Sequence, residues 1–258
     1  MFFRRVNHST KERNVKKMKK YIDMHCHILP GIDDGAKNEK EAMKMLRCAY
    51  EEGTRLMIAT PHYHYSRGNA EPKEIRTLVS RLQELVDGEG MDLKIYPGNE
   101  LYYSHDLLQK VKEGEVLTLA DSRYVLLEFS VDTERRRIRN ALYEFLNAGY
   151  LPIVAHMERY QAFHGNDGFV EEVYDMGAYL QINGSSLYGK NPWGMKLFCR
   201  KMMQDGLVHF VATDAHDLQQ RPVSLMKTAE WIGKKMGSLA IKNYLYKYPQ
   251  MIINNERI

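Results

Sequence analysis

The feature that most limits how this chain can fold is a repeated alternation of short apolar runs with longer segments of helical period. Seven β-prone runs occur, and amphipathic patterns lie between them. Strands that alternate with helices form parallel sheets, because each helix returns the chain so that the next strand runs in the same direction. The predicted strands occupy residues 21–25, 55–60, 93–96, 124–129, 151–155, 178–182 and 208–213.

Three of the helical patterns are long enough to define a buried face and an end. In residues 72–87 apolar side chains recur every three or four positions, and Gly88 follows them. Residues 37–52 and 132–148 repeat the scheme, each again followed by a glycine. We therefore predict an α/β fold. Seven such units without a linker favour closure into a (β/α) barrel over an open, doubly wound sheet.

Positive charge is concentrated at the start of the chain. The formal net charge is +4, but residues 1–20 carry eight Lys/Arg against one Asp/Glu, which leaves the rest of the chain at −3. We predict a flexible basic tail at 1–20 and one domain at 21–258. The alternative for the tail is a weak electrostatic tether to acidic lipid or to an acidic partner. A slightly acidic body is a poor surface for nucleic acid, so we expect no nucleic-acid partner.

The sequence has no segment typical of membrane insertion or export. No apolar stretch approaches the ~18 residues of a membrane helix, and the first residues lead into polar and basic ones instead of an apolar signal core. Cys26, Cys48 and Cys199 are an odd number of cysteines without a paired framework. We expect a cytoplasmic protein without disulfides and without stable membrane insertion.

Metal-binding residue types occur where the predicted strands end. His25 and His27 end the first strand two positions apart, so alternation along an extended chain points both imidazoles to one side and Cys26 to the other. The carboxyl ends of the strands meet at one end of a barrel, so side chains from different strands gather there. Six of the seven strands supply such residues: His25, His27, His62, His64, Glu100, Glu128, His156, Asp214 and His216.

One histidine or glutamate at a strand end is usually structural, but six strands that each place one at the same rim indicate a metal site. The set exceeds the needs of one ion, and imidazole with carboxylate suits Zn, Mn or Fe. We predict two or three divalent ions, which typically activate water and bind phosphoryl oxygens. Arg159 and Arg221 follow two of the histidines and are candidates for phosphate recognition, although each also fits an ordinary surface arginine.

These motifs resemble the polymerase and histidinol phosphatase (PHP) superfamily, in which an HxH motif ends the first strand and a DxH motif comes last. The two are represented here by His25/His27 and Asp214/His216. The stretch HCHILPGIDDG at 25–35 resembles more narrowly the manganese-dependent tyrosine-protein phosphatases of bacterial capsule and exopolysaccharide operons. The similarity spans about residues 20–258 and includes TPH at 60–62, GNE at 98–100, LEF at 127–129, HMERY at 156–160 and TDAH at 213–216.

The resemblance implies a distorted seven-stranded (β/α) barrel and three divalent metal ions, with manganese as the expected metal and iron, zinc or magnesium as alternatives. It also implies that Arg159 and Arg221 hold the phosphate. Met157 departs from the proline that is usual after the histidine, and this difference bears on the position of the loop that carries Arg159. The implied ligand sets are His25, His27, Glu100 and Asp214 for one ion, Glu100, Glu128 and His156 for a second, and Asp34, His62 and His216 for a third.

By the same resemblance the protein hydrolyses phosphotyrosine, and its substrate is a phosphotyrosine segment of a bacterial tyrosine autokinase that regulates polysaccharide synthesis. A cysteine nucleophile is excluded, because no arginine stands six residues after any of the three cysteines. We therefore expect direct attack by metal-bound hydroxide without a phosphoenzyme. The sequence does not identify the general acid.

Three other functions stay open at this point. They are a small-molecule phosphatase such as histidinol phosphatase, a phosphodiesterase acting on nucleic acid, and a regulatory barrel without activity. The acidic body disfavours the second, and the complete ligand set disfavours the third. For substrate choice, tyrosines near the rim are candidates for stacking against a phosphotyrosine ring, with ordinary packing as the alternative. They are Tyr63, Tyr65, Tyr102, Tyr103 and Tyr160.

Overall fold

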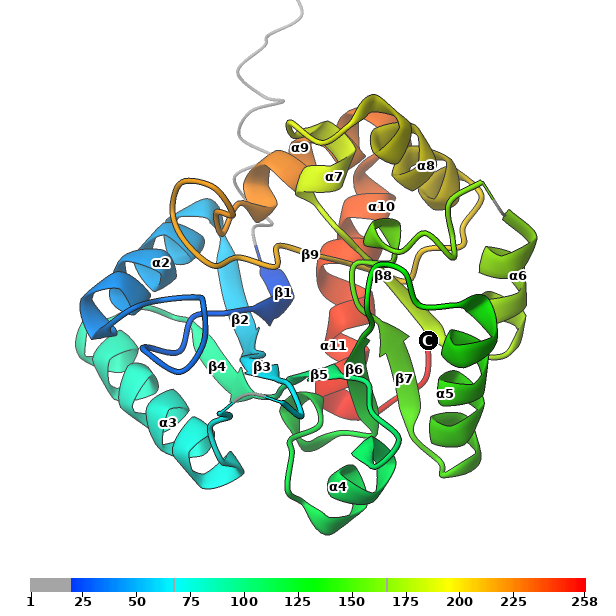
Figure 1. Ribbon diagram of the computed structural model, residues 1–258. Coiled ribbons are helices and arrows are strands. Elements are labelled where there is room, and N and C mark those ends of the chain that lie inside the picture. Colours follow the sequence, from blue (N-terminus) through cyan, green and yellow to red (C-terminus); the bar gives the residue numbers. More distant parts are fainter. Residues whose placement is uncertain (1–19, 67, 166) are drawn as a thin grey trace, which may run out of the picture.

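The structure is a computed structural model, and it describes residues 20–66, 68–165 and 167–258 (Figure 1). Apart from Lys20, the predicted flexible tail at 1–20 lies outside the described residues and stays a prediction. Among the described residues, every helix is too short or too polar to cross a membrane.

All seven predicted strands are present near their expected places. Two short strands that were not predicted, β3 and β5, follow the second and third after breaks at Pro61 and at Gly98. The Pro61 carbonyl there accepts hydrogen bonds from the Glu100 N–H (3.1 Å) and the Asn99 side chain (2.9 Å), which locks the two breaks together. The strands are β1 Tyr21–Cys26, β2 Thr54–Ala59, β3 His62–Tyr63, β4 Lys94–Pro97, β5 Glu100–Tyr102, β6 Tyr124–Glu128, β7 Leu151–Val154, β8 Tyr179–Asn183 and β9 Phe210–Ala212.

The strands form two parallel sheets that curl around one another. One has the order β1-β2-β4, and the other has the order β3-β5-β6-β7-β8-β9. A parallel bridge between Cys26 and Ala215 joins the first strand to the segment after the last, with the His27 N–H donating to the Ala215 carbonyl at 2.8 Å. The predicted parallel α/β fold is confirmed. Its distortion arises because the interrupted second and third strands pass from one sheet to the other.

Helices cover the outside of the curled sheet (Figure 1). The three predicted helices are present as α2, α3 and α5, and α2 begins where the Asn38 side chain accepts a hydrogen bond from the Glu41 N–H at 3.0 Å. The helices are α2 Glu39–Glu52, α3 Pro72–Gly88, α4 Leu107–Glu113, α5 Arg135–Asn147, α6 Asp167–Asp175, α7 Ser185–Tyr188, α8 Trp193–Gln204, α9 Leu225–Met236, α10 Ser238–Lys242 and α11 Tyr248–Asn254, with short turns η1 Leu119–Asp121, η2 Met157–Arg159 and η3 Asn243–Lys247.

Apolar side chains fill the amino-terminal end of the barrel. Phe210, Tyr124 and Tyr179 pack there against one another. Ile252 of α11 joins the same cluster, and the Tyr124 hydroxyl donates to the Glu256 carbonyl at 2.6 Å, so the C-terminal segment closes this end. The carboxyl end is left for polar residues.

Candidate metal centre

Four buried side chains meet at the carboxyl end of the barrel. His25 and His27 come from the end of β1, Glu100 begins β5, and Asp214 follows β9. One ligand atom from each lies within 4.8 Å of the others. The His25 Nε2 is 3.2 Å from Glu100 Oε2 and 3.4 Å from Asp214 Oδ1. Cys26 points away and donates to the Ile58 carbonyl at 3.3 Å, as the alternation of β1 predicts.

A second group opens toward solvent and consists of His27, Asp34, His62 and His216. The Asp34 Oδ1 lies 3.3 Å from His62 Nε2 and 3.2 Å from His216 Nε2, and 60% of the Asp34 side chain is exposed. Asp34 reaches this position because the loop after β1 folds back onto His27. A Cβ atom at Gly35 would lie 2.1 Å from the His27 carbonyl oxygen, so only glycine fits there.

The third group is His62, Glu100 and Glu128. The His62 Nδ1 lies 3.1 Å from Glu100 Oε2 and 3.6 Å from Glu128 Oε2. His156, the histidine implied for this ion, contacts both carboxylates through its Nε2, at 2.6 Å from Glu100 Oε1 and 3.9 Å from Glu128 Oε1. Glu100 is therefore the carboxylate that the first and third groups share. The structure brings all nine residues of the implied ligand sets together.

Three buried atoms in this cluster have no hydrogen-bond partner among the described residues: Glu100 Oε2, Asp214 Oδ1 and His216 Nε2. Buried polar atoms are ordinarily paired, so atoms left without a partner where several ligands converge fit coordination of a cation. The donor set is imidazole nitrogen and carboxylate oxygen, which suits Mn, Fe or Zn. The residues present therefore fit a multi-metal site.

The electrostatics of the cluster favour positive charge at its centre. Burial alone would raise the pKa of Glu100, but His25 and His156 beside it hold that pKa well below its usual value. Burial likewise would lower the pKa of His27, and the facing carboxylates, Asp214 first, hold it well above its usual value. A proton on His27 takes the place of a cation that would neutralise the same carboxylates, so metal binding would release it.

Two of the implied ligands have unusual backbone conformations. His156 has φ 30° and Asp214 has φ 52°, in the left-handed region that residues other than glycine rarely adopt. Each stands where a strand turns into the loop that carries one of the two predicted phosphate-binding arginines. Such strain persists at functional sites, where the surrounding structure holds it in place.

Both arginines reach the rim of the cluster. Arg159 bonds to Asp214 Oδ2, and the Met157 side chain, which replaces the usual proline, is buried without displacing it. Arg221 Nη2 lies 3.0 Å from Asp34 Oδ2, and its Nη1 lies 4.0 Å from Asp214 Oδ2. The two guanidinium groups thus approach the metal ligands from different loops.

Asp33 belongs to this site although the sequence analysis did not single it out. Its Oδ2 lies 2.7 Å from His27 Nδ1 and accepts from the His62 N–H at 3.2 Å, while its Oδ1 accepts from the Gly35 N–H at 2.9 Å. It fixes the orientation of the His27 ring. The Asp33-Asp34 pair in the motif was the available signal, but sequence alone cannot tell which aspartate faces the metal and which faces the histidine.

Comparison with known proteins decides the family. The sequence profile of the family described as capsular polysaccharide synthesis, CpsB/CapC, matches residues 21–254. The chain is 35% identical to the tyrosine-protein phosphatase CpsB of Streptococcus pneumoniae over 242 residues, which covers 92% of this chain and 100% of that protein. It is 31% identical to the tyrosine-protein phosphatase YwqE of Bacillus subtilis, over 92% of this chain and 93% of that one.

The chain belongs to the CpsB/CapC family of metal-dependent tyrosine-protein phosphatases. The resemblance seen in the sequence is thereby confirmed.

Solved structures support the family and extend the likeness of the fold. The fold matches, with a TM-score of 0.84 and 32% identity, a structure from the work on YwqE from Bacillus subtilis and CpsB from Streptococcus pneumoniae as metal-dependent tyrosine phosphatases. That match covers 92% of this chain and 96% of the other. The phosphotriesterase homology protein of Escherichia coli matches with a TM-score of 0.56 at 9% identity, covering 91% and 99% of the two chains, which shows a shared fold alone.

For two of the five tyrosines that are candidates for stacking, the alternative of ordinary packing holds in this CpsB/CapC member. Tyr160 is buried, and its hydroxyl lies 3.2 Å from His156 Nδ1. Tyr103 is also buried and donates to Glu144 at 3.2 Å. Both rings pack against Phe129, so core packing determines their position.

An aromatic group does stand at the surface near β3 and β5. The His64 ring stacks on Tyr65 with centroids 4.8 Å apart and meets Tyr102 at 4.3 Å. Tyr65 is 58% exposed. His64 thus lies with these rings and not in any of the three ligand groups, although the sequence placed it among the metal-competent residues.

Proposed function

We propose that this chain hydrolyses phosphotyrosine in a protein substrate, at a centre formed by the nine implied ligands. The observation that carries the proposal is the convergence, beside two arginines, of three buried ligand atoms that have no hydrogen-bond partner among the described residues. The number of ions we propose is three, with manganese as the expected metal and iron, zinc or magnesium as alternatives.

Divalent ions bound at this centre would supply an activated water and positive charge toward the phosphoryl oxygens. The chain's own residues supply the rest. Glu100 connects two of the ligand groups and holds them in one arrangement. Arg159 and Arg221 are both partly exposed at the opening, and their planar guanidinium groups suit two phosphate oxygens. Substrate enters on the side of Asp34 and His62, because the deeper ligands are fully buried.

The thiols take no part in this chemistry. Burial raises the pKa of Cys26 well above its usual value, and burial also raises the pKa of Cys48 and of Cys199. A thiol is nucleophilic only as the thiolate, so none of the three can attack phosphate efficiently near neutral pH. Water is therefore the nucleophile, and no phosphocysteine forms.

For the substrate we propose the phosphotyrosine segment of a bacterial tyrosine autokinase in the cytoplasm. This rests on the family resemblance. The exposed ring of Tyr65 and the half-buried rings of His64 and Tyr102 provide a surface against which a phenyl ring can stack.

The decisive test combines metal analysis of the purified protein with a comparison of three substrates at equal metal loading: a phosphotyrosine peptide, histidinol phosphate and single-stranded DNA. We expect bound divalent metal, reversible loss of activity on chelation, and highest efficiency on the peptide. Full activity after chelation would refute the metal centre. A tenfold preference for histidinol phosphate would replace the proposal with a small-molecule phosphatase, and cleavage of DNA would replace it with a phosphodiesterase.

A further inference from the structure

Strand β8 contributes no metal ligand, yet it ends in two buried amide side chains beside the ligands. The Gln181 Oε1 accepts from the His156 N–H at 2.7 Å and lies 3.3 Å from His25 Nδ1. The Gln181 Nε2 donates to Asn183 Oδ1 at 2.9 Å, and the Asn183 Nδ2 donates to Asp214 Oδ2 at 2.9 Å. The two amides therefore link three of the implied ligands.

In this series of hydrogen bonds, the direction of each bond follows from the first one, between the His156 N–H and Gln181. A backbone N–H can only donate, so the Gln181 atom that faces the His156 N–H must be the oxygen. Its nitrogen then faces Asn183, whose oxygen must accept. The Asn183 nitrogen is left to donate to Asp214.

These hydrogen bonds decide which atoms of His25 and Asp214 are available to bind a metal. Because Gln181 Oε1 is an acceptor, His25 carries a proton on Nδ1, so in the neutral ring the lone pair is on Nε2, which lies 3.3 Å from His27 Nε2. Asn183 and Arg159 occupy Asp214 Oδ2, which leaves Oδ1 without a partner among the residues described. The His25 Nε2 and the Asp214 Oδ1 lie 3.4 Å apart and face one centre.

We propose that Gln181 and Asn183 are positioning residues that set the tautomer of His25 and the free oxygen of Asp214, and so determine metal affinity. Buried Glu158 holds Asn183 in place, because its Oε1 accepts from the Asn183 N–H at 2.9 Å and from the Ser186 hydroxyl at 2.7 Å. Groups that orient metal ligands in this way typically change metal affinity 10- to 100-fold when they are removed. This inference rests on the proposed metal centre.

The test compares Gln181→Leu with Gln83→Leu. Gln83 is a matched control because its amide also bridges a helix and a strand, donating to the Leu93 carbonyl at 3.0 Å and accepting from the Ile95 N–H at 2.9 Å, away from the ligands. Titration calorimetry of Mn²⁺ into metal-free protein should show about a 10- to 100-fold weaker affinity for Gln181→Leu and an unchanged affinity for Gln83→Leu. Nitrogen NMR of the metal-free protein, at a pH at which His25 is neutral, should show the His25 proton on Nδ1 in the wild type and a mixture of tautomers in Gln181→Leu.

Two further variants keep the test decisive if Gln181→Leu does not fold. Gln181→Glu retains the acceptor for His25 and should keep the His25 tautomer while recovering part of the affinity. Asn183→Ser removes the donor to Asp214 and should weaken Mn²⁺ binding without changing that tautomer. Equal Mn²⁺ affinities in all variants would overturn the positioning role of Gln181 and Asn183. A wild type that binds no divalent metal would overturn the proposed function itself.

A second inference rests on a different observation, the charge of a cavity beside the metal centre. A cavity of about 570 Å³ lies between η2, α7 and the start of α9. Arg159 and Arg221 form its inner wall, Lys190 and Lys227 are exposed on its outer part, and its lining includes no carboxylate. Glu52 lies near the start of α9, where its carboxylate accepts from the Ser224 hydroxyl and the Met226 N–H, each at 3.3 Å.

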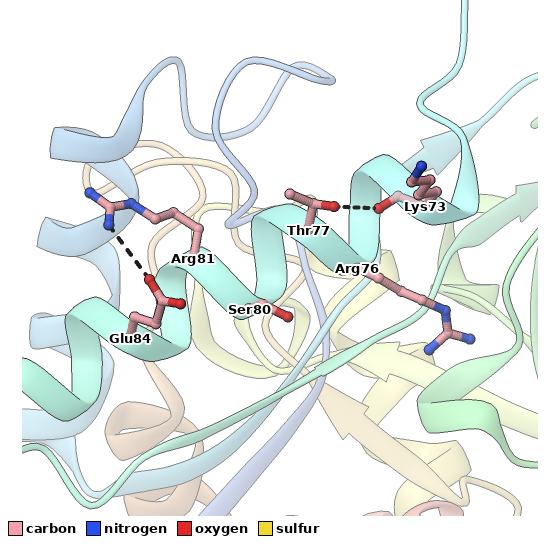
Figure 2. A pocket seen from close by; sticks show the side chains of 6 residues that line it. All are labelled: Lys73, Arg76, Thr77, Ser80, Arg81 and Glu84. Atoms are coloured by element: carbon pink, nitrogen blue, oxygen red, sulfur yellow. Dashed lines mark hydrogen bonds and ion pairs between the residues drawn. The ribbon is translucent and has the colours of Figure 1, made fainter.

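A hollow on the outer face of α3 provides the contrast (Figure 2). It has three cationic side chains, of which Arg76 pairs with Asp121, and Arg81 pairs with Glu39 and Glu84. Arg76 and Arg81 point in opposite directions (Figure 2). The arginines of the cavity beside the metal centre are also paired, with Asp214 and Asp34. The difference lies in the lining: Glu84 lines the hollow, whereas the cavity has two lysines that form no ion pair with any residue that the structure describes and has no carboxylate in its lining.

From this charge we infer that the cavity is a subsite for an acidic side chain, Asp or Glu, close in sequence to the phosphotyrosine of the substrate. The arginines bind the phosphate at the inner end, and the lysines attract a carboxylate at the outer end. The inference deepens the proposed function and rests on it. Exposed charge pairs are individually weak, so two of them together should favour an acidic peptide about three- to tenfold.

The experiment measures kcat/KM for three phosphotyrosine peptides that differ only in having Glu, Gln or Lys near the phosphotyrosine, with phenyl phosphate as a substrate that lacks flanking residues. Wild-type protein should prefer the Glu peptide, and the double variant Lys190→Glu/Lys227→Glu should prefer the Lys peptide. The control Lys234→Glu/Lys235→Glu makes the same charge change on an exposed part of α9 outside the cavity and should keep the wild-type order.

The outcomes separate the two proposals. Equal rates on the three peptides, with phenyl phosphate hydrolysed, would overturn the acidic subsite and leave the proposed function standing. If the control variant also changed its order of preference among the three peptides, the acidic subsite would be overturned, because the effect would then be one of overall charge. Wild-type protein that hydrolyses neither peptides nor phenyl phosphate would overturn the proposed function.

Discussion

The two ends of the barrel use the same strands for opposite purposes. At the amino end, Tyr124 and Phe210 pack in an apolar cluster that Ile252 of α11 closes. At the carboxyl end, Glu100 and Asp214 are equally buried but face histidines, and each has an oxygen without a hydrogen-bond partner among the described residues. Apolar burial stabilises a fold, whereas gathered charges do so only when they are paired. Substitutions at the two ends should therefore have separable effects on stability and activity.

The largest effect is expected for Glu100→Gln, which keeps the volume of the side chain and removes its charge. Loss of a shared ligand should reduce kcat on the order of a thousandfold or more, beyond the 10- to 100-fold typical of residues that only orient ligands. Metal analysis should show that bound metal is lost. Glu144→Gln makes the same change on α5, where the carboxylate contacts Tyr103, and should retain activity. A fully active, metal-loaded Glu100→Gln would contradict the shared-ligand role.

The apolar end should show the reverse pattern. Phe210→Ala removes a fully buried ring and should lower the free energy of unfolding by about 3–5 kcal/mol, measured by urea denaturation of chelated protein. The folded fraction, reloaded with metal, should keep a near-normal kcat. Leu197→Ala truncates a side chain that is 48% exposed and should change stability by less than about 0.5 kcal/mol. If Phe210→Ala were as stable as Leu197→Ala, the amino end would not be the stabilising core.

Arg221→Ala should have a smaller effect than loss of a ligand. A charged hydrogen bond to phosphate is worth about 1.5–3 kcal/mol, which corresponds to a loss of roughly ten- to a hundredfold in kcat/KM. Arg200→Ala is the comparison, because Arg200 is also partly exposed but bonds to the Leu187 carbonyl. Arg221→Lys should recover only part of the loss, since an ammonium lacks the planar fork. Unchanged kcat/KM in Arg221→Ala would remove this arginine from phosphate binding.

The sequence predicted the parts of this molecule that repeat or that carry distinctive chemistry. The alternation of strands and helices predicted the parallel α/β fold, and the HxH spacing predicted that both imidazoles would face away from Cys26. It did not predict the short strands β3 and β5 that follow the breaks at Pro61 and Gly98, because two or three residues are too few to show a strand pattern.

Long-range pairing explains what else was missed. Gln181 and Asn183 stand on β8, which supplies no ligand, and their importance depends on His156 and Asp214, which lie far away in sequence. Tyr103 and Tyr160 were candidates for stacking as well as for packing, and neighbours in sequence did not reveal that both pack against Phe129. Polar residues that act through other residues leave no pattern in a single sequence.

The amino end also contains a titratable group, and this gives a pH prediction. Burial lowers the pKa of His209 to about 4, and its Nδ1 accepts from the Leu180 N–H at 3.1 Å, which requires the neutral ring. A lowered pKa means that His209 favours folding above pH 6.5 and loses that contribution as pH falls toward 4. Between pH 7 and pH 5 the loss should be about 2 kcal/mol. His209→Asn should remove this part of the pH dependence, as urea denaturation at the two pH values would show; an unchanged difference would assign it to other groups.

The smallest effect is expected at Cys48, and that is why it tests the mechanism cleanly. Cys26 and Cys199 are fully buried, so replacing either with Ser places a hydroxyl in the core and would confuse stability with chemistry. Cys48 is partly exposed on α2, and burial together with Glu52 and Glu51 raises the pKa of its thiol. Cys48→Ser should keep kcat within about twofold of the wild type, and iodoacetamide should inhibit wild-type protein only slowly, because little thiolate is present. Rapid inactivation by iodoacetamide that Cys48→Ser abolishes would place a thiol in the reaction and contradict direct attack by water.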